Sequence, residues 1–183
     1  MILAGTWLVS LLSTPGFAAY PPRVVVDLPD GDCIVGDTHA GSISVSVASY
    51  ASSLTPEALG AYFRIGSGGG FTGVLVGERW GATFHLGNVT DGAIVAYEQC
   101  QPGRFEIVRL TYQVYGTSPP CSYLEVLPHP DYSSVIALTC AGGAVETKPW
   151  GPLWVNYAPQ CGAAWCVLAT ESSSWGKIKA LYR

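Results

Sequence analysis

The chain has 183 residues and a formal net charge of −4, with 49% hydrophobic and only 12% charged residues. This hydrophobic content excludes a disordered chain, and without a basic run in the body of the chain a nucleic-acid partner is not expected. The length suits one domain with a sizeable core.

The N-terminal segment is typical of an export signal. An apolar stretch at residues 2–12 is followed by Pro15, and Gly16 and Ala18 supply the small residues of a cleavage site. The stretch is too short for a comfortable membrane span, and the alternative is a buried N-terminal strand or helix. The expected organisation is a signal peptide, a β-sandwich domain and a C-terminal tail, at residues 1–18, 19–170 and 171–183.

Strand patterns recur along the chain, and no segment after the export signal keeps a helical period for three turns. Residues 42–47 alternate Ser with Ile or Val, which predicts a strand with its serines exposed. Residues 93–97 are apolar on both faces and indicate a central strand. Residues 108–114 alternate again, and the opposite parity of Phe105 and Ile107 predicts a bulge near Ile107. Further strands are expected at residues 23–28, 61–65, 73–76, 82–86, 124–127, 135–138 and 153–157.

Turn residues separate these strands, with no helices between them. This spacing is typical of an antiparallel sandwich. The predicted fold class is therefore all-β, an immunoglobulin-like or cohesin-like antiparallel sandwich stapled by disulfides.

Six cysteines indicate an oxidising compartment, so we expect a secreted or surface-attached protein. They are Cys33, Cys100, Cys121, Cys140, Cys161 and Cys166. A hairpin of residues 124–127 and 135–138, centred between Pro130 and Asp131, would bring Cys121 opposite Cys140. Cys161 and Cys166 would close a short loop. The predicted pairs are Cys33–Cys100, Cys121–Cys140 and Cys161–Cys166.

An acidic cluster near the N-terminus is a candidate calcium site, because Ca²⁺ takes carboxylate and carbonyl oxygens. Its members are Asp27, Asp30, Asp32 and Asp37. Their spacing matches no EF-hand loop, and Asp30 and Asp32 flank a glycine as in an ordinary turn. No other cofactor is expected.

Catalysis is not expected, because no local group of side chains combines a nucleophile, a base and an orienting acid. Only His39, beside Asp37 and near Ser42, has local partners, and the alternative is a histidine in a turn. A secreted hydrolase whose site assembles from distant loops remains the rival interpretation.

Aromatic residues gather late in the chain, with Trp150, Trp154 and Tyr157 as weak candidates for ligand binding. On a strand, Trp150 and Trp154 share parity and could form a flat platform for sugar rings. The alternative is that they cap the core. The leading interpretation is a non-catalytic binding or structural module with a protein or polysaccharide partner at the cell surface, and a carbohydrate-binding module is a further alternative.

Three stretches, residues 87–100, 120–130 and 174–183, are similar to a group of secreted bacterial proteins. These proteins share a C-terminal tail of the form Trp-Gly-x-(Ile/Val)-Lys-x-Leu-(Tyr/Phe)-Arg. The resemblance implies export and a β-sandwich, with no assigned activity and no catalytic residue. In the tail, Trp175, Ile178, Leu181 and Tyr182 share one arc of a helical wheel, which suggests a sorting or attachment element. The alternative is a strand that completes a sheet.

Overall fold

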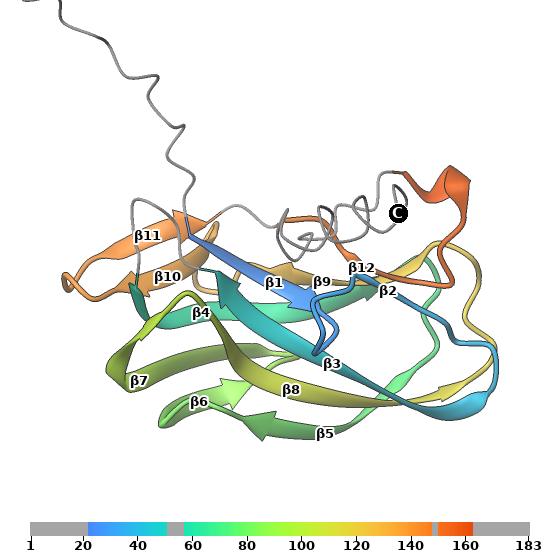
Figure 1. Ribbon diagram of the computed structural model, residues 1–183, viewed down its shortest axis with the longest axis horizontal. Coiled ribbons are helices and arrows are strands. Elements are labelled where there is room, and N and C mark those ends of the chain that lie inside the picture. The colour runs from blue at the N-terminus through green and yellow to red at the C-terminus, as the bar shows by residue number, and fades with distance from the viewer. Residues whose placement is uncertain (1–21, 51–56, 148–149, 163–183) are drawn as a thin grey trace, which may run out of the picture.

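The computed structural model describes residues 22–50, 57–147 and 150–162, which form a sandwich of two β-sheets (Figure 1). The smaller sheet contains β1 (Arg23–Asp27), β3 (Ala40–Tyr50), β8 (Arg104–Tyr115) and β5 (Val74–Trp80), in that order. The larger sheet contains β6 (Phe84–Asn88), β7 (Gly92–Pro102), β4 (Glu57–Gly68), β9 (Ser122–Leu127), β10 (Val135–Thr139), β11 (Ala144–Thr147), β12 (Leu153–Val155) and β2 (Ile34–Val35). Among these strands β2 and β12 pair in parallel, and the other pairs are antiparallel.

The all-β prediction is confirmed, and the described residues contain one short helical element, the 3₁₀ turn η1 (Pro159–Cys161). No helix within the described ranges has the length and apolar character needed to cross a membrane. The expected signal peptide at 1–18 and the expected tail at 171–183 lie outside the described residues.

The core lies between the sheets and follows from the alternation along the strands. Val45 of β3 and Leu110 of β8 face Phe63 of β4 and Val95 of β7, and all four side chains are fully buried. Burying a side chain of this size contributes about 1.5–3 kcal/mol. The bulge is also confirmed, because the register between β3 and β8 shifts after Val47 and passes over Ile107.

One prediction about β3 is wrong. Ser46 was expected at the surface with the other serines, but it has no exposed area. Its hydroxyl donates a hydrogen bond of 2.5 Å to Glu106, and Arg109 contacts the same carboxylate oxygen at 2.7 Å. This ion pair therefore covers Ser46 on the outer side of the smaller sheet.

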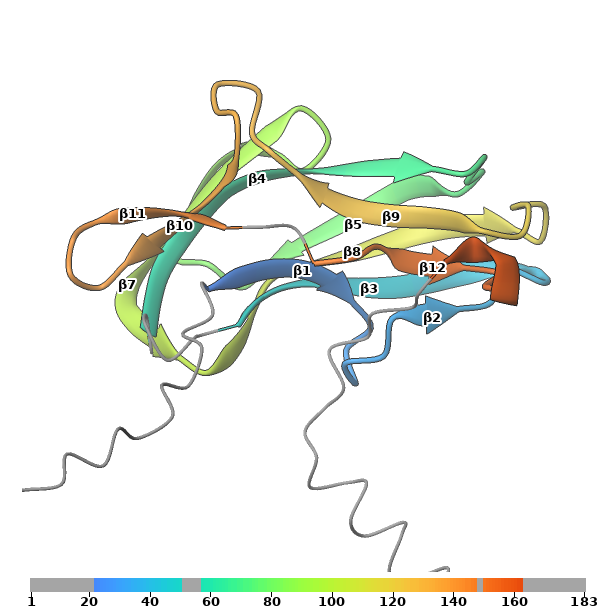
Figure 2. The same cartoon turned by 90° about the horizontal axis from the view of Figure 1, so that it is seen from above.

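The predicted hairpin of β9 and β10 is also wrong. Both strands pair antiparallel with β4, β9 with residues 64–68 and β10 with residues 58–62. They therefore follow one another along β4, and residues 128–134 leave the sheet and return to it (Figure 2). Tyr132 in this excursion packs on Tyr62 of β4, with ring centres 5.2 Å apart.

The disulfides consequently differ from the predicted pairs. Cys100 at the end of β7 is bonded to Cys140 after β10, and Cys121 before β9 is bonded to Cys161 in η1. The first bond joins β7 to the end of β10, two strands that both pair with β4. The second joins the start of β9 to the 3₁₀ turn that follows its neighbour β12. Cys33 is disulfide-bonded as well, and Cys166 lies outside the described residues. All three predicted pairs are therefore wrong: Cys121–Cys140 depended on the hairpin, Cys161–Cys166 on the short loop between them, and Cys33–Cys100 on the other two.

Peptide mapping under non-reducing conditions should recover the pairs Cys100–Cys140 and Cys121–Cys161. By elimination, the third pair should be Cys33–Cys166. Each described bond spans 40 residues of sequence, for which the chain-entropy estimate is about 4 kcal/mol of stabilisation. Mass spectrometry of the digest gives the result, and a peptide joining Cys121 to Cys140 would contradict this arrangement.

Candidate functional site

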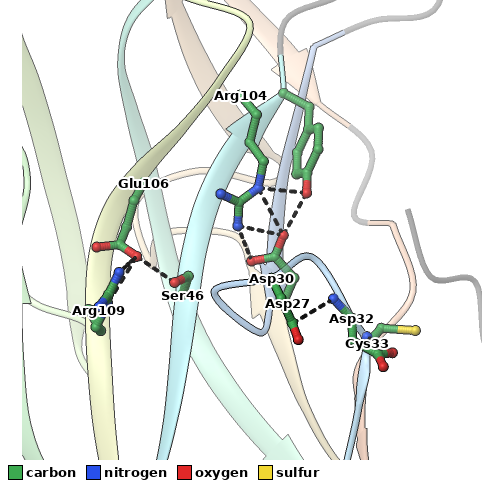
Figure 3. A network of polar contacts seen from close by, with 9 residues as sticks. Asp27, Asp30, Asp32, Cys33, Ser46, Arg104, Glu106 and Arg109 are labelled. Carbon is green, nitrogen blue, oxygen red and sulfur yellow. Dashed lines mark hydrogen bonds and ion pairs between the residues drawn. The ribbon is translucent and has the colours of Figure 1, made fainter. Parts of the chain in front are cut away.

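Asp27 at the end of β1 lies in a buried polar network (Figure 3). Its carboxylate accepts hydrogen bonds from Arg104 Nη2 at 2.9 and 3.0 Å and from the Tyr50 hydroxyl at 2.6 Å. Burial raises the pKa of Asp27, and the bond from Tyr50 and the charge of Arg104 offset only part of that rise. Burial and the neighbouring carboxylate raise the pKa of Tyr50 to about 12. The network joins β1, β3 and β8 and is structural.

Asp37 lies in a second buried network, between loops. The backbone N–H groups of Gly116 and Ser118 donate to its two carboxylate oxygens at 2.6 and 3.1 Å. The Asn156 amide donates to the backbone carbonyls of Asp37 and Ser118 at 3.0 and 2.7 Å. Burial alone would raise the pKa of Asp37, but the hydrogen bonds from Ser118 and Gly116 outweigh it and lower that pKa. The carboxylate therefore holds the loop after β2 against the loop after β8.

The four aspartates of the predicted calcium site are not brought together. Asp30 accepts a bond from the backbone of Asp32 at 3.2 Å, and Asp32 caps the N–H of Cys33 at 2.7 Å, as in a local turn (Figure 3). Asp27 and Asp37 serve the two separate networks. One set of potential ligands meets within the described ranges, namely Glu57, Cys100 and Cys140. Its two cysteines form a disulfide, so it offers no thiolate to a metal.

The positions of the three histidines do not fit a catalytic triad of serine, histidine and carboxylate. His39 Nδ1 is 2.8 Å from the hydroxyl of its neighbour Thr38, while Asp37 is held by backbone amides. His85 stacks on Trp80 with ring centres 4.5 Å apart. His129 is 3.6 Å from Asp131. Within the described chain, no histidine has a hydrogen-bonded serine together with a carboxylate.

The late aromatic residues lie in different planes. The Arg23 guanidinium lies 3.0 Å from the centre of the Trp150 ring and covers one face of it. Trp154 is inclined by 75° to Tyr123 and by 60° to Tyr157. These rings do not form one flat platform, and sugar binding by them stays a prediction. Tyr123 joins this cluster from β9, where it is paired with Trp154, a neighbour that only the sheet order reveals.

Exposed apolar side chains gather at one side of the sandwich. The large hydrophobic residues that are exposed in the described chain are Ile34, Val74, Val76, Phe84, Leu86, Tyr115 and Tyr132. Four of these seven belong to β5 and β6, the edge strands of the two sheets, which Figure 1 shows along one side of the molecule. Such clustering is typical of an interaction surface.

Two rows of side chains extend this surface across the outer side of the larger sheet, because opposite residues of antiparallel strands share a face. The first row is Leu86, Ile94, Tyr62 and Ile136, and the second is Phe84, Ala96, Gly60 and Leu138. We call the residues Phe84, Leu86, Ile94, Ala96, Tyr62 and Leu138 the apolar face. On the outer side of the smaller sheet, β3 and β8 carry Ser42, Ser44, Thr111 and Gln113 in the corresponding positions, so its centre is polar and apolar Val74 lies at its β5 edge. The apolar face is therefore the candidate functional site.

The chain matches no protein-family model and no curated protein sequence. Its fold is similar to that of solved cohesin modules. A cohesin module from a family 33 glycoside hydrolase of Clostridium perfringens ATCC13124 matches 75% of this chain and 98% of its own, with a TM-score of 0.52 and 8% identity. The sixth cohesin of scaffoldin B from Acetivibrio cellulolyticus, solved in complex with a Cel5 dockerin mutant, matches 76% and 99%, with a TM-score of 0.52 and 10% identity. The fold is thus a cohesin-like β-sandwich, as one of the two predicted alternatives stated.

Proposed function

We propose that this protein is a non-catalytic, secreted or surface-exposed module that binds another protein through the apolar face. The observation that carries the proposal is the concentration of apolar side chains on the outer side of the larger sheet. The A. cellulolyticus cohesin, which shares the fold, was solved in complex with a dockerin. A protein partner is thus compatible with this architecture.

The chemistry of the apolar face defines the partner. Phe84 and Leu86 are 51% and 54% exposed, and Ile94 and Ala96 beside them are half-buried. None of the six residues of the face is charged. A partner must therefore offer apolar side chains over most of its contact area, with polar groups confined to the rim. The disulfides and the signal-like residues 1–18 support an extracellular setting for this contact.

Replacing Ile94 with Lys should weaken partner binding at least about tenfold, because it places a charge at the centre of an apolar contact. Ile94 points outward, so we expect the melting temperature to stay within a few degrees of the unmodified protein. Ser44→Lys is the matched control, since it adds the same charge to the exposed outer side of the smaller sheet.

The measurement is quantitative capture of proteins from the medium of the source organism, followed by cross-linking to locate the contact. The proposal requires that a partner captured by the unmodified chain and by Ser44→Lys is lost with Ile94→Lys. If the two lysine variants capture the same proteins equally, binding does not use the apolar face.

A further inference from the structure

Strand β6 is an edge strand without the usual protection of an edge. It pairs with β7 and with no other strand in the described chain. In such a strand alternate N–H and C=O groups point outward and can pair with another chain. Residues Phe84–Asn88 contain no charge and no proline, and the pairing with β7 has no register shift. From Phe84 to Leu86, before the positive φ of 77° at Gly87, the open side of β6 is therefore a regular template for a further strand.

The other described edges are protected. The edge strand β5 has a register shift between Leu75 and Gly77 and carries Glu78 and Arg79. Strand β11 carries Glu146. Strand β1 begins and ends with a charged residue, and β2 has only two residues. Charges, bulges and short length are devices that prevent pairing between edges. Among the described edge strands, β6 is the one without these devices, which suggests that its edge pairs with another strand.

We propose that two copies of this protein pair through their β6 strands, antiparallel, about a two-fold axis at His85. In this register Phe84 of each copy lies opposite Leu86 of the other, on the outer side of the sheet. Pairs of an aromatic and an aliphatic residue at such positions stabilise antiparallel strands. Since β6 contains no charged residue, this pairing brings no like charges together. The segment Phe84–Leu86 is therefore complementary to itself. A contact of this symmetry closes on itself and forms a dimer.

The same register makes the apolar face continuous across both copies. The row that runs from Tyr62 through Ile94 to Leu86 continues into Phe84 and Ala96 of the second copy. The larger sheets of the two copies become one sheet, with one uninterrupted outer surface. This inference goes beyond the proposed function, because self-association requires the edge of β6 and no other protein.

Sedimentation of the full chain from about 1 μM to about 1 mM should show a dimer that forms with increasing concentration. The decisive comparison uses two double variants that remove the same apolar groups. Phe84→Lys with Leu86→Lys places like charges opposite one another across the axis. Phe84→Lys with Leu86→Glu places opposite charges there. We expect the first to dissociate at least about tenfold more readily than the second.

Val74→Lys with Val76→Lys is the control, because it adds the same charges to the exposed side chains of β5 and should leave the dimer unchanged. Thermal melts verify that the variants are folded. Since the two β6 variants differ only in the sign of one charge, their comparison holds even if both are less stable than the original chain.

A chain that stays monomeric over the whole concentration range overturns the proposal, as does a β6 that pairs only with a strand from another protein. Equal association of the two β6 variants overturns it as well, because the register about His85 requires them to differ.

Discussion

Replacing Arg104 with Met should lower the free energy of unfolding by about 3 kcal/mol near pH 7. Its guanidinium is 2.9 Å from Asp27, whose side chain is only 3% exposed, whereas that of Arg104 is 32% exposed. Removing one partner of a buried ion pair leaves an uncompensated charge, which typically costs 3–5 kcal/mol, and the partial exposure of Arg104 places this case at the lower end. Denaturation by urea gives the measurement.

The control is the double variant Asp27→Asn with Arg104→Met, which should be more stable than Arg104→Met alone. The pH dependence gives a second check. Because the folded-state pKa of Asp27 is raised, its contribution to stability is full at low pH and is lost as the pH rises through that pKa. Loss of Arg104 raises the pKa of Asp27 further, because the positive charge of Arg104 lowers it. The loss of unfolding free energy in Arg104→Met should therefore be smaller near pH 4 than near pH 7. An equal loss at both pH values would contradict this interpretation.

Replacing Asp37 with Ala should cost about 3 kcal/mol, because the N–H groups of Gly116 and Ser118 lose their acceptors. Asp37→Asn keeps one acceptor oxygen and should cost roughly half as much. The pKa of Asp37 is lowered, so its contribution is present above the ordinary pKa of an aspartate and is lost as the pH falls through the lowered value.

Urea denaturation at several pH values tests this prediction. The difference in unfolding free energy between the original chain and Asp37→Ala should become smaller as the pH falls. Unchanged stability of Asp37→Ala at neutral pH would show that the carboxylate does not hold the loops. Asp27 and Asp37 both belong to the predicted calcium cluster. Their contributions to the stability of the fold should nevertheless depend on pH in opposite directions. Their different surroundings explain this contrast, because one carboxylate is more strongly affected by burial and the other by donated hydrogen bonds.

The positions of most strands could be predicted because each depends on a local pattern, but the short strands β2 and β11 were not predicted. The alternation at residues 42–47 and 108–114 identified the inner faces of β3 and β8, and the change of parity at Ile107 identified the bulge. The burial of Ser46 could not be predicted, because it depends on Glu106 and Arg109 from another strand. A period of two identifies a face, but it does not identify what covers that face.

The connection between β9 and β10 shows where local patterns fail. The segment at residues 128–131 has the turn residues expected of a hairpin. Those residues equally suit an excursion between two strands that share the partner β4. The predicted pair Cys121–Cys140 depended on that choice. The pair Cys161–Cys166 was expected from its short loop and fails because Cys161 is bonded to Cys121, which no local pattern indicates.

The apolar face was missed for a related reason. Phe84 and Leu86 alternate with His85, and this alternation predicts a strand with an apolar side facing the core. In the sheet, His85 lies opposite Val95, a core residue, and the apolar pair lies on the outer side. The sequence signal for this inversion is the neighbouring strand, where Ile94 and Ala96 add a second apolar side to β7.

The two described disulfides have a further consequence for a protein exposed to proteases. Their spans, 100–140 and 121–161, overlap. A single cut anywhere between residues 101 and 160 therefore leaves both halves of the chain covalently joined, and a cut in the excursion at residues 128–134 leaves them joined by both bonds. One cleavage of this segment does not release a fragment, so the protein can be cut within the excursion at residues 128–134 and still remain one molecule.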